Sequence, residues 1–294
     1  MSSPEIAEKP SLTDTLLLAT PGLIWGASFL LIAEGLKAMG PYGVTFTRIA
    51  IGFLTLSLFP AARRGVSWDA WPHIALVGLV WMAFPLTLFP LAEQRVSSAL
   101  TGMLNGANPL FTALVATLLT RRLPSRGILV GLGVGLFGAV LTAWPSLGEG
   151  RSSVIGVVLI LAALVSYGFA LNLAVPLQHR HGVLPVLWRA LGTALLLTAP
   201  LGVPEVLRAD LSATGPLLSL LALGVFGTGI AYVVLTTVAG RLGATRASAT
   251  TFLIPGVALA LGVLVRNETV APLAILGAAV CIAGAWLMRQ AKGR

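Results

Sequence analysis

Apolar residues in this chain gather into ten long blocks that are separated by short polar segments. Eight of the blocks hold no charged residue: 15–33, 74–91, 96–120, 127–148, 152–178, 211–240, 247–265 and 270–288. Two further blocks, 42–59 and 183–203, hold one arginine each. A helix that crosses a bilayer needs roughly 20 mostly apolar residues. The pattern therefore predicts an all-α integral membrane protein with ten transmembrane helices.

The two halves of the chain match each other at a nearly constant offset. A shift of 146 places Pro109 on Pro255, and a shift of about 141 places Arg48 on Arg189. Five blocks per half is an odd number, so the second copy must enter the membrane from the opposite side. We therefore expect two inverted five-helix repeats, with a substrate site between them near mid-bilayer, as in secondary transporters. The expected units are a cytoplasmic tail at 1–14, repeats at 15–148 and 152–289, and a cytoplasmic tail at 290–294.

The distribution of basic residues sets the expected orientation. If the N-terminus is cytoplasmic, twelve Lys and Arg residues fall on that side: Lys9, Arg63, Arg64, Arg121, Arg122, Arg126, Arg180, Arg241, Arg246, Arg289, Lys292 and Arg294. Five fall on the other side: Lys37, Arg95, Arg151, Arg208 and Arg266. This bias fits the positive-inside rule and opposes the reverse orientation. The net charge of +9 therefore reflects topology, and we expect no nucleic-acid partner.

Several motifs resemble a known group of membrane proteins. They are "LIWGASF" in the first predicted helix, a mid-helix proline in the fourth and ninth, and "VRNETVAPLAILGAAVCIAGAWL" at the end. With the two five-helix repeats, they resemble the drug/metabolite transporter superfamily, its EamA-type exporters and, within these, the YddG-type aromatic amino-acid exporters. The resemblance implies an exporter of small metabolites in the bacterial inner membrane that functions as a monomer. The family often has a glutamate after the fourth and ninth helices, where this chain has Arg122 and Glu268, so we assign Glu268 no substrate role.

The fourth predicted helix carries a polar stripe at mid-depth. Thr101, Asn105, Asn108 and Thr112 are spaced four, three and four apart, which places them on one helix face. Pro109 removes a backbone donor and clashes with the carbonyl of Asn105, so we expect a hinge there. Unpaired amides are costly in hydrocarbon. The stripe therefore either lines a water-filled cavity or bonds two helices together.

Other polar and aromatic residues fall at mid-span in other blocks. Thr228, Tyr232 and Thr236 share one helix face, and an aromatic group around Trp81 either lines a pocket or packs at the membrane interface. The predicted substrate-contacting residues are Trp25, Ser28, Trp81, Met82, Phe84, Asn105, Asn108, Tyr167, Asn172, Tyr232, Ser248 and Thr251, with hinges at Pro109 and Pro255.

Charged residues within the spans are few. Arg48 and Arg189 each lie about six residues from a helix start, where they either snorkel, pair structurally or serve the transport path. We expect no Asp or Glu inside any span, hence no intramembrane proton relay and transport down the gradient of the substrate itself.

Several other functions lack the residues that they need. The sequence shows no phosphate-binding glycine loop, no metal-ligand cluster, and no nucleophile with a base and orienting carboxylate. We therefore expect no cofactor, no metal and no enzyme activity, and a small-molecule substrate in contact with a lipid-embedded protein. The prediction is a secondary exporter of aromatic and other neutral amino acids that works by alternating access. The alternatives are export of other metabolites or drugs, a passive channel and, least favoured, an intramembrane enzyme.

Overall fold

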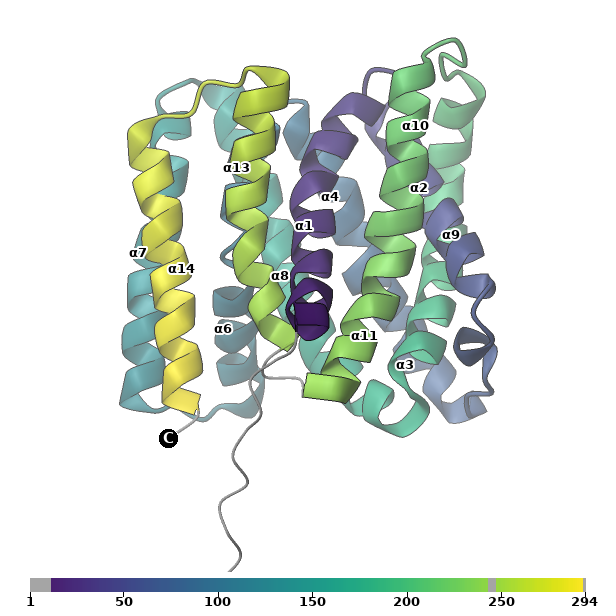
Figure 1. The fold of residues 1–294 in the computed structure, drawn as a ribbon, viewed down its shortest axis with the longest axis horizontal. Coiled ribbons are helices and arrows are strands. Elements are labelled where there is room, and N and C mark those ends of the chain that lie inside the picture. Colours follow the sequence, from purple (N-terminus) through teal and green to yellow (C-terminus); the bar gives the residue numbers. More distant parts are fainter. Residues whose placement is uncertain (1–11, 243–246, 293–294) are drawn as a thin grey trace, which may run out of the picture.

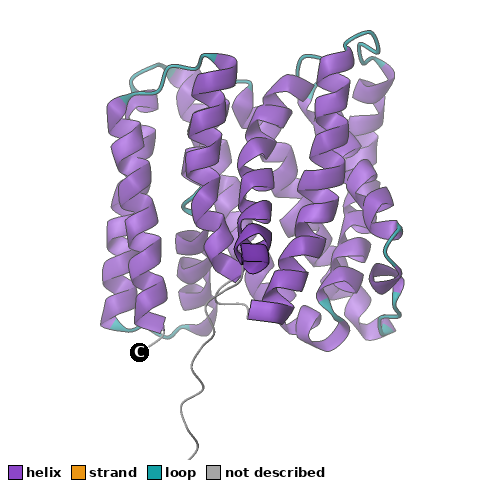
Figure 2. Ribbon diagram, in the orientation of Figure 1, coloured by secondary structure: helices purple, strands orange, loops and turns teal. Residues whose placement is uncertain are grey.

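The computed structural model describes residues 12–242 and 247–292, and these form a bundle of helices without any strand (Figures 1 and 2). This confirms the predicted all-α class. By length and composition, eight helices can cross a membrane, and a ninth is obtained if one bent pair is counted as a single span. The expected tail at 1–14 lies mostly outside the described residues, and the first helix already begins at Leu12. The expected tail at 290–294 is described as far as Lys292, where the last helix ends.

The helices of the two halves follow the same order. The first half consists of α1 (Leu12–Gly35), α2 (Pro41–Ser57), α3 (Trp71–Val77), α4 (Phe84–Glu93), α5 (Ser98–Asn105), α6 (Asn108–Thr120) and α7 (Arg126–Leu147). The second consists of α8 (Arg151–His181), α9 (Val183–Leu207), α10 (Thr214–Ala222), α11 (Ala231–Leu242), α13 (Leu253–Arg266) and α14 (Pro272–Lys292). Short η segments complete the chain: η1 (Pro60–Arg63), η2 (Trp68–Ala70), η3 (Gly78–Ala83), η4 (Leu223–Ile230) and η5 (Ser248–Phe252).

Irregular backbone occurs at matching places in the two halves. The segments η3 and η4 are π-helical and begin at positions 78 and 223. The two described non-glycine residues with positive φ, Arg121 at 52° and Asn267 at 54°, end the helices α6 and α13 and lie 146 positions apart. The irregularities therefore recur close to the offset that relates the two halves of the sequence.

Glycines bring α7 and α14 into close contact at one side of the bundle (Figure 1). A Cβ atom at Gly138 would lie 2.3 Å from the backbone nitrogen of Cys281, and one at Gly284 would lie 2.3 Å from that of Gly135. Without a large apolar driving force between helices in lipid, such small residues allow backbones to approach and gain van der Waals contact.

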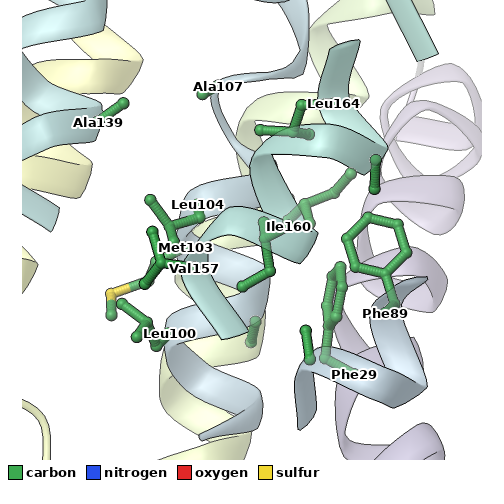
Figure 3. Close-up of a cluster of buried hydrophobic side chains, with 14 of the residues drawn as sticks. Phe29, Phe89, Leu100, Met103, Leu104, Ala107, Ala139, Val157, Ile160 and Leu164 are labelled. Carbon is green, nitrogen blue, oxygen red and sulfur yellow. The ribbon is translucent and has the colours of Figure 1, made fainter. Parts of the chain in front are cut away.

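A cluster of buried apolar side chains joins α1, α4, α5 and α8 (Figure 3). The rings of Phe29 and Phe89 meet edge to face with centroids 5.6 Å apart, and Leu100 and Met103 lie close to Ile160 in the same cluster. Phe29, Phe89 and Leu100 of this cluster lie toward the end of the bundle where α1 finishes and α5 begins, which is called the closed end below.

We expect Gly138→Ala to destabilise the protein, because the added methyl group meets backbone that cannot move aside. Overpacking of this kind typically costs about 1–3 kcal/mol. The measurement is the thermal unfolding midpoint of the purified protein in detergent. Gly133→Ala is the matched control on the same helix, because a Cβ there meets nothing within 4 Å and alanine favours the helix over glycine. Equal midpoints for both variants would contradict the described α7–α14 contact.

Candidate functional site

A cavity of about 690 Å³ lies in the middle of the bundle. Its volume falls within the range of small-molecule sites, roughly 300–1,000 Å³. Residues from both halves of the chain line it, and eight of them are predicted substrate contacts: Trp25, Ser28, Trp81, Asn105, Asn108, Tyr167, Tyr232 and Thr251. Residues that were predicted from separate helices thus meet around one space.

The structure places three other predicted contacts away from this cavity, and a fourth cannot be placed. Met82 is fully buried in a second apolar cluster with Leu187, and Phe84 is 47% exposed on the outer surface of the bundle. Asn172 uses its amide nitrogen to join two helices, donating to the carbonyls of Thr112 at 3.2 Å and Gly168 at 2.8 Å. Ser248 begins η5, but its side chain lies outside the described part of the chain.

The span that carries the predicted polar stripe breaks at mid-length. Helix α5 ends at Asn105, α6 begins at Asn108, and the two axes differ by 44°. Pro109 lies in the first turn of α6 and has no N–H with which to continue the helix. The side-chain oxygens of Asn105 and Asn108 are buried and accept no hydrogen bond from any described residue. In this conformation they bridge no helices, and both amides line the cavity.

The matching proline of the second half has a different setting. Pro255 lies in the first turn of α13, which follows η5 without a comparable bend. A Cβ atom at Gly106 would lie 2.5 Å from Cγ of Pro255, so the break in the first half packs against the start of α13. Gly106 therefore permits the close approach of these two segments.

Aromatic rings form one wall of the cavity. The ring of Tyr232 meets Trp25 at 5.3 Å and Trp81 at 6.0 Å, both edge on. The indole N–H of Trp25 donates to the carbonyl of Gly227 at 3.0 Å, within the π-helix η4. Such edge-to-face arrangements are favourable for aromatic pairs, and the wall presents apolar surface with a few polar edges.

The two arginines within spans have different surroundings. Arg189 places its guanidinium over the rings of Trp71 and Trp188, at 5.8 and 5.3 Å, and donates to the carbonyl of Pro185. This is the structural pairing that the sequence left open. Arg48 instead lines the cavity and is only 5% exposed, with one hydrogen bond from Nε to the hydroxyl of Thr228 at 3.2 Å.

The expectation that no carboxylate lies within a span is wrong. The span that ends with α4 includes Glu93, and the span formed by α1 includes Glu34. Both carboxylate oxygens of Glu93 are buried and have no hydrogen-bond partner among the described residues. Glu93 lies two residues beyond the uncharged block at 74–91, so the apolar pattern does not include it in a span. The absence of titratable groups therefore no longer supports uncoupled transport.

Ionic contacts hold the closed end together. Glu268 accepts hydrogen bonds from the N–H of Ser98 at 3.1 Å, the N–H of Ala99 at 2.9 Å and the hydroxyl of Ser98 at 2.8 Å. Arg266 pairs with Glu268 at 3.0 Å and also with Glu34 of α1. Burial opposes ionisation of Glu268, but these hydrogen bonds outweigh it and lower the pKa of its carboxyl group. The carboxylate also faces the positive end of the α5 dipole.

The cavity extends toward the opposite end of the bundle, which is called the open end. There it is lined by Gln178 and His179 near the end of α8, Val183 at the start of α9, and Ala239 and Gly240 near the end of α11. Helix α14 also ends and α1 begins on this side (Figure 1). At its other limit the cavity reaches Phe29, Ile32 and Phe89 of the buried cluster. Among the described residues, the lining thus runs from the open end to the buried cluster and not through to the closed end.

Comparison with known sequences gives one family. The sequence model of the EamA-like transporter family matches the chain twice, over residues 13–144 and 154–290.

Individual relatives and a solved structure agree with this match. A "Probable terminal-alkyne amino-acid exporter" of Streptantibioticus cattleyicolor is 29% identical over 92% of this chain and 91% of its own length. An "Uncharacterized transporter YdfC" of Bacillus subtilis is 27% identical over 89% and 86%, and a "Probable amino-acid metabolite efflux pump" of Salmonella typhimurium is 25% identical over 90% and 91%. A crystal structure with 20% identity superposes with a TM-score of 0.62 over 94% of this chain and 96% of that chain, which shows the fold alone.

We expect Glu268→Gln to lower the thermal unfolding midpoint by a few degrees at neutral pH. Because the pKa of Glu268 is lowered in the folded protein, its stabilising effect is present above the ordinary glutamate pKa, about 4.3. It is lost as the pH falls through the lowered folded-state value. The gap between wild type and variant should therefore close below about pH 4.

The control for this experiment is Glu149→Gln, which changes an exposed carboxylate in the loop before α8 and should leave the midpoint unchanged at every pH. A gap for Glu268→Gln that stays constant from pH 7 to pH 4 would show that its charge does not hold the closed end.

Proposed function

Since the chain belongs to the EamA-like transporter family, we propose that it exports aromatic and other neutral amino acids across the bacterial inner membrane by alternating access. The observation that carries this proposal is the central cavity, where aromatic rings and unpaired amide oxygens from both halves surround one space. Two relatives with amino-acid export in their names support the substrate class. No cofactor is required for such a cycle.

We propose that the fold comprises ten spans in two inverted five-helix repeats, at 15–148 and 152–289. The double match of the family model supports two repeats, as do the matching π-helices and helix ends. Contacts between helices also agree with two repeats. In the first half α6 packs on the first helix of the second half, α8, and in the second half α13 packs on the first helix of the first half, α1. The helix α2 has 17 residues and gives a span on this reading, and α5 with α6 gives a single bent one.

The observed conformation corresponds to a cytoplasm-open state under this proposal. The excess of Lys and Arg in the segments assigned to the open end supports a cytoplasmic location for that end, and we propose the same side for both termini. An exporter loads its substrate from that side, so the cavity is open where amino acids are available. The closed end, held by Glu34, Arg266 and Glu268, would separate for release on the other side.

The aromatic wall favours export of amino acids over that of strongly polar metabolites. Trp25, Trp81 and Tyr232 offer apolar surface to a side chain of similar character. The enclosed apolar limit at Phe29 and Phe89 supports a carrier rather than a passive channel, because a channel needs a continuous path. We propose that one chain is the functional unit.

We expect Asn105→Ala and Asn108→Ala to weaken transport without loss of folding, because neither amide oxygen has a partner to lose. A hydrogen bond to substrate contributes about 0.5–1.5 kcal/mol, so affinity should fall roughly two- to tenfold. The measurement is counterflow of labelled L-phenylalanine in liposomes, normalised to folded protein.

Asn172→Ala is the matched control, because its amide joins α8 to α6 and lies outside the cavity. It should lower thermal stability while leaving transport per folded molecule unchanged. If Asn105→Ala and Asn108→Ala behave like Asn172→Ala, the amides are structural and the proposed site is refuted.

A further inference from the structure

We propose that Arg48 binds the carboxylate of the exported molecule and so limits the substrates to compounds that carry an anionic group. This inference rests on the proposed transport function and specifies its substrate class. It assigns a role to Arg48, the one arginine among the described residues that line the cavity.

The position of Arg48 provides the first argument. A guanidinium remains protonated in proteins and offers five N–H donors in a planar fork. In Arg48 one donor, Nε, bonds to Thr228, and no described carboxylate forms an ion pair with it. Arg48 is only 5% exposed, yet it lines the cavity. The charge of Glu93 acts on Arg48 only from beyond ion-pair distance, so an anion that enters the cavity and bonds directly to the guanidinium gains a strong and specific interaction.

The remaining polar groups of the cavity complement an ammonium group. The amide oxygens of Asn105 and Asn108 and the hydroxyl oxygen of Thr250 are buried without hydrogen-bond partners in the described structure. All three residues line the same cavity as Arg48. Oxygen acceptors suit an ammonium donor. In the described part of the chain, the lining residues include no Asp or Glu that would select a compound with positive charge alone.

The combination selects a zwitterion with an apolar body. The guanidinium binds the carboxylate, the amide oxygens accept from the ammonium group, and Trp25, Trp81 and Tyr232 contact the side chain. Compounds that keep the ring and the amine but lack the carboxylate would leave Arg48 unpaired at the cost of its desolvation. We therefore expect aromatic amines and cationic drugs to be poor ligands.

The test compares three probes as competitors of L-phenylalanine counterflow in liposomes. Phenylpropionate keeps the carboxylate and lacks the amine, phenethylamine keeps the amine and lacks the carboxylate, and L-phenylalaninamide has a neutral amide in place of the carboxylate. With wild-type protein, phenylpropionate should compete and the other two should compete at least tenfold more weakly. Hydrogen bonds to a charged group contribute about 1.5–3 kcal/mol, which corresponds to roughly 10- to 100-fold in affinity.

Variants of two matched arginines then separate a binding role from a structural one. Arg48→Gln should reduce L-phenylalanine affinity by the same roughly 10- to 100-fold and abolish the preference for phenylpropionate over phenethylamine. Arg48→Lys keeps the charge but loses the planar fork of donors, so it should retain only part of the preference. Arg189→Gln, at the corresponding position of the second half and outside the cavity, should keep the wild-type preference. Thermal stability of each variant is measured so that a misfolded protein is recognised.

Each outcome decides one of the two proposals. Equal competition by phenethylamine and phenylpropionate in wild type, or an unchanged preference in folded Arg48→Gln, refutes the carboxylate site. If Arg48→Gln does not fold, Arg48→Lys decides: a reduced affinity and a reduced preference in a folded lysine variant support the guanidinium contact, and wild-type affinity with the full preference refutes it. If wild type moves no amino acid, direct uptake of labelled phenylpropionate and phenethylamine replaces competition. Uptake of the carboxylate alone then supports the Arg48 site while refuting amino-acid export, and uptake of the amine alone refutes both.

Discussion

Backbone hydrogen bonding in hydrocarbon is the constraint on which this structure depends. Each N–H and C=O within the membrane needs a partner, so irregular backbone is tolerated only where protein or a water-filled cavity supplies one. The chain departs from regular helix at the Asn105–Asn108 break and in the π-helices η3 and η4. In both π-helices a side chain from the opposite half supplies a donor: Ser166 bonds to the carbonyl of Val80, and Trp25 bonds to that of Gly227. π-Helical turns are frequent at functional sites, and these lie beside the cavity.

The two halves have the same order of helices but differ in the placement of the side chains that make the cavity polar. Arg48 enters the cavity while its counterpart Arg189 lies against two tryptophans. The break at Pro109 bends a span by 44°, whereas Pro255 sits in an unbroken helix that packs against Gly106. One end is held by ion pairs and the other is open. Two similar repeats could exchange the open and the closed arrangement of the two ends. The differences between the halves give the cavity a cation at one place and hydrogen-bond acceptors at another.

Much of this arrangement could be predicted from the sequence, because long apolar blocks and a mid-span proline have strong physical consequences. The spacing of Asn105 and Asn108 left two interpretations open, a cavity lining and a bond between helices, and in the structure both residues line the cavity. Met82 and Phe84 could not be placed in this way, since apolar side chains suit a cavity wall, a core or lipid equally well. Glu93 was not predicted to lie within a span because hydropathy locates the ends of a span poorly, and the burial of its carboxylate oxygens depends on neighbouring helices. Whether Arg48 lines the cavity depends on which way its helix faces, and only tertiary packing determines that orientation.

The most direct test of the account is a structure of the protein with L-phenylalanine bound, determined under conditions that keep the open end accessible. The account predicts ligand density in the central cavity, with its carboxylate at Arg48, its ammonium group near the amide oxygens of Asn105 and Asn108, and its ring against Trp25 and Tyr232. Density only at a lipid-facing groove, or a cavity that stays empty at saturating ligand while Arg48 pairs with Glu93, would contradict it.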